Sequence, residues 1–127
     1  MVKLVLLKKA KSGVSREELI EYLREIHGPR NSELPGIQNY SLSVQVDPET
    51  HDDVPEELAY YDSRDDIPVD PAETKYSTLE IHEFETIDDL IKAHTSTDVK
   101  EAARDVEDVI DFEDEVAFVV EDEQIDQ

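Results

Sequence analysis

Apolar residues recur along this chain with two periods, and they divide it into four predicted strands and two predicted helices. Residues 3–8 carry apolar side chains on both alternations, which is typical of a central strand covered on both faces. From Tyr40 to Val46 apolar and polar residues alternate strictly, so this strand has one apolar face. Residues 76–84 and 116–120 complete the set of strands.

The first helix is predicted to begin at Ser15, because Ser15 and Glu18 form a capping box. Apolar residues then follow at helical spacing as far as Ile26, and Gly28-Pro29 is expected to end the helix. A second helix is predicted to begin at Thr86, to run to about His94 and to restart at residues 96–98.

The resulting order β-α-β-β-α-β is the ferredoxin-like arrangement of an α+β protein, in one domain over residues 1–127. Two helices can cover only one face of such a sheet, so the other face needs a partner. We therefore expect a homodimer that closes into an α+β barrel. Residues 47–75 hold four of the six prolines and read as an acidic excursion, and the last residues form a short acidic tail.

Charge restricts the partners. Thirty-four acidic residues face 12 basic ones, a formal net charge of −22. Nucleic acid and anionic membrane surfaces are therefore not expected as partners. Because the acids are spread through every segment, we favour a folded protein of a high-salt cytoplasm, where screening removes most of the repulsion. An acidic protein of an ordinary cell is the alternative. There is no cysteine, so a disulfide or a thiolate nucleophile is excluded. There is no apolar run of 18 residues, so no membrane-spanning helix is expected.

Two residues suit proton transfer. His27 has a side chain that titrates near neutrality and could act as a general acid or base, or it could only cap the carbonyl end of the first helix. Tyr40 could donate its phenol proton to a developing oxyanion, or it could be a core aromatic residue.

Three further residues are weaker candidates for substrate binding. Glu80 and His82 share one strand face, where they form either an acid–base pair in a pocket or polar groups at the dimer interface; we favour the interface. Arg30 could hold an anionic substrate, although a surface ion pair is the simpler expectation. His51 and His94 lack the spacing of a metal site, and no phosphate loop or dinucleotide motif is present, so no metal or cofactor is expected.

One compound motif resembles a known family. Residues 15–19 (Ser-Arg-Glu-Glu-Leu), Tyr22, residues 27–29 (His-Gly-Pro), residues 34–36 (Leu-Pro-Gly) and Tyr40 are similar to the EthD family of dimeric α+β barrel proteins. That resemblance implies the barrel fold and a pocket lined by His27 and Tyr40. Its relatives include cofactor-independent isomerases and cyclases, polyketide-pathway enzymes and proteins of ether degradation.

Two functions follow as hypotheses. The first is a small-molecule enzyme without a bound cofactor, which transfers a proton near a carbonyl as an isomerase, cyclase or dehydratase. The second is a non-catalytic protein that binds a small organic ligand or serves as an accessory subunit. A pocket that holds both His27 and Tyr40 would favour the enzyme.

Overall fold

The computed structural model describes residues 1–45, 76–102 and 104–126, so the predicted excursion at 47–75 lies outside the described residues. Four strands form one antiparallel sheet in the order β2-β3-β1-β4. Their bounds are β1 Val2–Lys8, β2 Ile37–Val44, β3 Thr78–Phe84 and β4 Val116–Glu121. The predicted central position of the first strand is confirmed, since β1 pairs with β3 on one side and β4 on the other.

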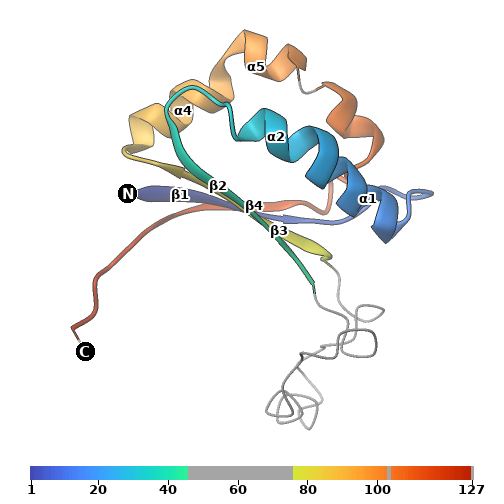
Figure 1. The fold of residues 1–127 in the computed structure, drawn as a ribbon, viewed down its shortest axis with the longest axis horizontal. Helices are drawn as coiled ribbons and strands as arrows, with labels where there is room; N and C mark the ends of the chain where they lie inside the picture. Colours follow the sequence, from blue (N-terminus) through green and yellow to red (C-terminus); the bar gives the residue numbers. More distant parts are fainter. Residues whose placement is uncertain (46–75, 103, 127) are drawn as a thin grey trace, which may run out of the picture.

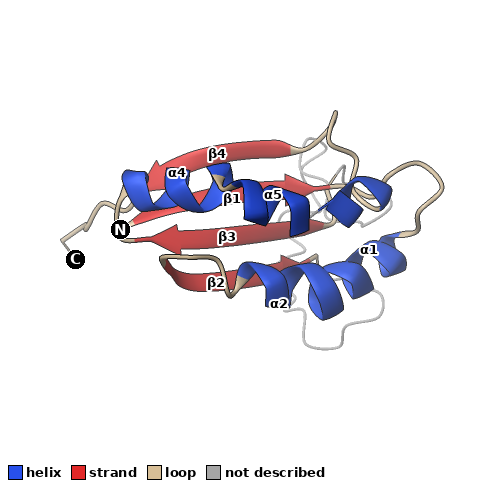
Figure 2. Cartoon of the chain, turned by 90° about the horizontal axis from the view of Figure 1, so that it is seen from above, coloured by secondary structure: helices blue, strands red, loops and turns tan. Residues whose placement is uncertain are grey.

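Every described helix lies on the same face of the sheet, as Figure 1 shows. The first helical run, α1, η1 and α2, follows the β2 side, and α4 with α5 follows the other side (Figure 2). The bounds are α1 Arg16–Tyr22, η1 Leu23–His27, α2 Gly28–Asn31, α4 Ile87–Thr95, α5 Thr97–Ala102 and η3 Arg104–Asp108. This is the predicted ferredoxin-like α+β fold. Among the described helices, none has the length and apolar character needed to cross a bilayer.

Both predicted helix starts are confirmed by their caps. The Ser15 hydroxyl accepts a hydrogen bond from the Glu18 amide at 3.1 Å, and the Thr86 hydroxyl accepts one from the Asp89 amide at 3.2 Å. Each cap satisfies an amide that the helix itself leaves without a partner. The two caps therefore determine the residues at which the two helical runs begin.

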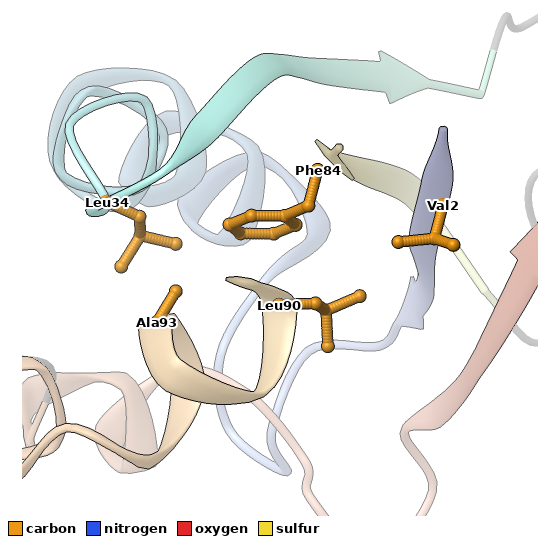
Figure 3. Close-up of a cluster of buried hydrophobic side chains, with 5 residues drawn as sticks. All are labelled: Val2, Leu34, Phe84, Leu90 and Ala93. Carbon is orange, nitrogen blue, oxygen red and sulfur yellow. The ribbon is translucent and has the colours of Figure 1, made fainter. Parts of the chain in front are cut away.

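Two apolar clusters hold the helices on the sheet. One is drawn in Figure 3 and joins β1 and β3 to α4 and to the turn after α2. It contains Val2, Leu34, Phe84, Leu90 and Ala93. The other packs the first helical run against the segment before β4; it contains Leu19, Tyr22, Leu23, Val106 and Ile110. Between these two clusters the buried side chains are polar, and they form the site described below.

The predicted helix end at Gly28-Pro29 is wrong. The helix passes through one π-helical turn, η1, and continues as α2 to Asn31. In this turn the Gly28 amide bonds to the Leu23 carbonyl, five residues back, and Pro29 then lies in the first turn of α2, where no amide is needed. Proline is tolerated because the chain restarts its helical register there.

Gly28 is needed for a second reason, namely the close approach of β2. A Cβ at position 28 would lie 2.5 Å from the Leu23 carbonyl oxygen and 3.3 Å from the Tyr40 ring. Tyr40 also lies inside β2 rather than at its start, because pairing begins at Ile37. The strand therefore carries Tyr40 beneath the helix.

The sheet face away from the described helices carries an apolar patch on β1, β3 and β4, while its β2 part, Asn39, Ser41 and Ser43, is polar. Strand alternation and register place on it Val5, Leu7, Leu79, Ile81, Val116, Phe118 and Val120. Phe118 is 46% exposed, and Val116 is also exposed. Exposed apolar surface of this kind is an association surface.

We predict that two copies associate through this face. Sedimentation of the full chain in 2 M KCl should give a dimer, and Phe118→Asp should shift it towards monomer because it places a charge in an apolar contact. Ile91→Asp is the matched control: Ile91 is 49% exposed on α4, and its replacement should leave the dimer intact. A wild-type species of 14.5 kDa at micromolar concentration would contradict the prediction.

Candidate functional site

A buried ion pair forms the centre of the site. The Lys8 ammonium on β1 lies 3.1 Å from Glu80 Oε1 on β3, and these residues are only 3% and 0% exposed. The register brings them together, because Leu6 pairs with Glu80 and Lys8 follows on the same face. Removing one partner of a buried pair typically costs about 3–5 kcal/mol, since the other charge is left unpaired.

His27 reaches this pair from the π-helical turn. The Lys8 ammonium donates to His27 Nε2 at 3.1 Å, so His27 is neutral and carries its proton on Nδ1. Burial, together with the neighbouring Lys8 charge, lowers the pKa of His27 to about 4. The Tyr22 ring stacks on the imidazole at 5.8 Å. His27 is 6% exposed and the helical run continues beyond it as α2, so it does not cap exposed carbonyls at a helix end, which was the alternative to a proton-transfer role.

A chain of hydrogen bonds continues from Glu80 to the second helix. His94 Nδ1 donates to the Leu90 carbonyl at 2.9 Å, and burial lowers the pKa of His94, so its Nε2 is an acceptor. His82 Nδ1 lies 3.1 Å from that nitrogen, and His82 Nε2 faces Glu80 Oε2 at 3.3 Å. The His82 ring therefore links His94 to the carboxylate.

Glu80 carries the negative charge of this cluster. Burial by itself raises the pKa of Glu80, but the His82 hydrogen bond and the Lys8 charge together lower it to about 2. Glu80 is therefore a carboxylate, with the Lys8 ammonium at Oε1 and the His82 ring at Oε2. The buried charges are paired, as buried charges must be.

Tyr40 lies on the same sheet face as this cluster. It pairs with His82 across β2 and β3, and the two rings meet edge to face at 5.3 Å. Burial, followed by the negative charge of Glu80, raises the pKa of Tyr40, so the phenol keeps its proton. The hydroxyl oxygen is buried and makes no hydrogen bond with the described residues.

A cavity of about 190 Å³ opens beside the cluster, between the sheet and the helices. It is lined by strand residues Leu4, Leu6, Lys8 and His82 and by helix-side residues His27, Asn31, Leu34, His94, Val99 and Lys100. The site thus has apolar walls with a few polar groups, which is typical of small-ligand pockets.

The structure brings most of the predicted residues together. His27, Glu80 and His82 touch one network, and Tyr40 packs against it. Of these four, only His27 and His82 line the cavity, so the expected pocket lined by both His27 and Tyr40 is met by His27 alone. The favoured placement of Glu80 and His82 at a dimer interface is wrong: both face the helices, because the register aligns them with Leu6 and Leu4 of the inner face. Arg30 donates two hydrogen bonds to Asp105, at 2.8 and 3.3 Å, which is the expected ion pair.

Sequence reasoning missed Lys8, Asn31 and His94 as site residues. Lys8 had a usable signal, because it follows Leu4 and Leu6 on the inner alternation of a central strand, where a lysine must find a partner. His94 lies one turn after Leu90 on the apolar side of its helix, which also indicates burial. Asn31 had no signal, because it lies beyond the predicted helix end.

No protein-family model and no curated protein matches the sequence. Solved structures do match. An EthD family protein from Bacillus halodurans has a TM-score of 0.60 at 14% identity, over 97% of this chain and 99% of that one. A hydroxynitrile lyase from Passiflora edulis has a TM-score of 0.63 at 14% identity, over 98% and 96%. A dimeric protein of ferredoxin-like fold from Bacteroides fragilis has a TM-score of 0.55 at 13% identity, over 94% of each chain.

This chain has the EthD-like α+β fold. The likeness confirms the architecture that the sequence motif implied. At 13–14% identity it says nothing about the residues of the pocket. The chemistry of the EthD-like pocket therefore has to be argued from its own side chains.

The site predicts a loss of stability on mild acidification. The pKa of His27 is about 4 in the fold and near 6.5 when unfolded, so the unfolded chain binds more protons and stability falls as pH drops from 6.5 towards 4. Between pH 7 and 5 this should cost about 2 kcal/mol in the free energy of unfolding. Denaturant titrations in 2 M KCl should show the loss, and His27→Gln should reduce it.

Arg24→Gln is the control for this experiment, because Arg24 is exposed in the same turn and does not titrate in this range. It should keep the wild-type dependence on pH. An unchanged pH dependence in His27→Gln would show that His27 is not held neutral by the fold.

Proposed function

We propose that this protein is a small-molecule enzyme that works without a bound cofactor and transfers a proton next to a carbonyl group of its substrate. The reaction is of the isomerase, cyclase or dehydratase type. The observation that carries the proposal is the position of His27: buried, neutral and in contact with Lys8 on one side while it lines the cavity. A buried imidazole in this position suits proton transfer better than packing.

His27 passes the proton. Its Nε2 accepts from the Lys8 ammonium, while its Nδ1–H is buried and makes no hydrogen bond with the described residues. When Nδ1 donates its proton to the substrate carbonyl oxygen, Nε2 takes a proton from Lys8. Nδ1, now without a proton, removes the proton from the neighbouring carbon, and Nε2 returns its proton to Lys8, so the substrate becomes the enol and His27 regains its first state. The cation on Nε2 makes Nδ1–H a better donor than a solvent-exposed imidazole.

Tyr40 is the second donor. Its hydroxyl stays protonated because its pKa is raised, and it lies on the same face as the cluster. A protonated phenol can stabilise the oxyanion that forms when a proton leaves the neighbouring carbon. Glu80 and His82 hold Lys8 and Tyr40 in place, so their role in the proposal is to position these groups.

The proposed enzyme is a homodimer. The apolar outer face needs a partner, and the similar protein from Bacteroides fragilis is dimeric. The likeness to a hydroxynitrile lyase supports an enzyme of small molecules on this fold. The cavity itself is built from described residues of one chain.

Proton exchange tests the proposal without a known substrate. The protein is incubated in D2O with 2 M KCl and a panel of small ketones, oxo acids and lactones, and loss of the α-proton signal is followed by NMR. Exchange of at least one compound should be accelerated. His27→Gln should reduce that rate by about 10²–10⁴-fold, and Tyr40→Phe by about 10²-fold.

Tyr76→Phe is the matched control for the phenol, because Tyr76 lines a separate hollow at the ends of β2 and β3, whereas the Tyr40 ring meets His82 of the cavity wall. Its exchange rate should equal that of the wild type. If the protein accelerates exchange of no compound in the panel, the enzyme proposal fails and a non-catalytic ligand-binding protein takes its place.

A further inference from the structure

The charge of the cavity lining is opposite to that of the protein. Acidic residues make up 34 of the 127 residues, yet none of the described residues lining this cavity is acidic. Its polar lining consists of two lysines, three histidines and one asparagine, namely Lys8, Lys100, His27, His82, His94 and Asn31. Glu80 lies behind this lining, where Lys8 and His82 already occupy its oxygens. An anion can therefore enter the cavity without meeting a carboxylate in its wall.

Two buried donors in this wall have no acceptor. Asn31 Nδ2 and His27 Nδ1 make no hydrogen bond with the described residues, and the two residues are 7% and 6% exposed. A buried donor without an acceptor has lost its hydrogen bond to water and gained none in return, which destabilises the fold. Both residues line the cavity and lie four positions apart on one continuous helical run. The pair calls for an oxygen acceptor from a ligand.

A third group can supply charge to the same ligand. Lys100 on α5 lines the cavity, is exposed and makes no ion pair with the described residues. Arg30 cannot take this role, because Asp105 holds its guanidinium and it lines only the neighbouring hollow. That hollow shares Asn31, Leu34 and Val99 with the cavity, so the ligand has an approach from solvent between α2 and α5. Glu33 and Asp98 also line the hollow, so an anion passes these two carboxylates, whose charge molar salt screens, before it reaches the donors.

We propose that the substrate is a small organic carboxylate. Its carboxylate accepts from Asn31 Nδ2 near Lys100, its carbonyl oxygen accepts from His27 Nδ1, and its apolar part packs on Leu4, Leu6, Leu34 and Val99. The cavity of about 190 Å³ corresponds to about six water volumes, which suits a molecule of benzoate size rather than a drug-sized one. This inference rests on the proposed function, since it names the substrate class of the same site.

Benzoate and benzamide test the inference, because they match in shape and differ in charge. The full-length protein is titrated with each in 2 M KCl, and binding is followed by NMR chemical shifts of the protein. Benzoate should bind at least about tenfold more tightly than benzamide, as expected for a charge-assisted hydrogen bond. Equal affinities, tighter binding of benzamide, or no binding of either at millimolar concentration would overturn the proposal.

Variants then locate the carboxylate. Lys100→Gln should weaken the binding of benzoate by about fivefold to tenfold and leave the affinity for benzamide unchanged. Lys92→Gln is the matched control, since it removes the same charge from an exposed site on α4 that does not line the cavity, and it should change neither affinity. Asn31→Asp should abolish the preference for benzoate. If Lys100→Gln behaves like Lys92→Gln, the assigned position of the carboxylate is wrong.

Binding and catalysis are separated by this design. A benzoate preference with no α-proton exchange in the panel would leave the ligand class standing and remove the proposed catalysis. Exchange that depends on His27, with no preference for benzoate over benzamide, would leave the proposed catalysis standing and remove the proposed ligand class.

Discussion

The site depends on one buried ion pair, Lys8 with Glu80. The two residues join the central strands β1 and β3, and neither can be buried alone, because an unpaired charge in this interior would cost several kcal/mol. The pair also needs hydrogen-bond partners for its remaining atoms. His27 accepts from Lys8 and His82 donates to Glu80, so the pair fixes the orientation of both imidazoles. The protonation state of the site follows from these contacts.

The helical irregularity near Pro29 serves the same site. A regular helix through residues 23–31 would meet the missing amide and the ring of Pro29 in its interior. The π-helical turn avoids this and brings His27 against Lys8, while Gly28 lets Tyr40 pass beneath the helix. π-helical turns are frequent at functional sites, where they redirect one side chain. Here the redirected residue is the one that faces both the ion pair and the cavity.

Much of the architecture was predictable because it follows from local rules. A continuous apolar run predicted β1, alternation predicted β2 and β3, and the caps at Ser15 and Thr86 predicted the helix starts. The helix end was not predictable from Gly28-Pro29, since proline is a stop signal only where the helical register is regular. The face carrying Glu80 and His82 also needed the structure, because their alternation defines a shared face but not which layer covers it. The network itself depends on long-range register, which pairs Leu6 with Glu80 and Tyr40 with His82.

Histidine protonation tests the central claim most directly, because the buried Lys8–Glu80 pair decides which ring nitrogen of His27 carries the proton. Long-range ¹H–¹⁵N correlation spectra of the protein at pH 7 in 2 M KCl report both ring nitrogens of every histidine. His27 should be neutral with its proton on Nδ1, because its Nε2 accepts from Lys8, and His94 should carry a proton on Nδ1, which donates to the Leu90 carbonyl. A proton on Nε2 of His27 would contradict the proposed role of the ion pair.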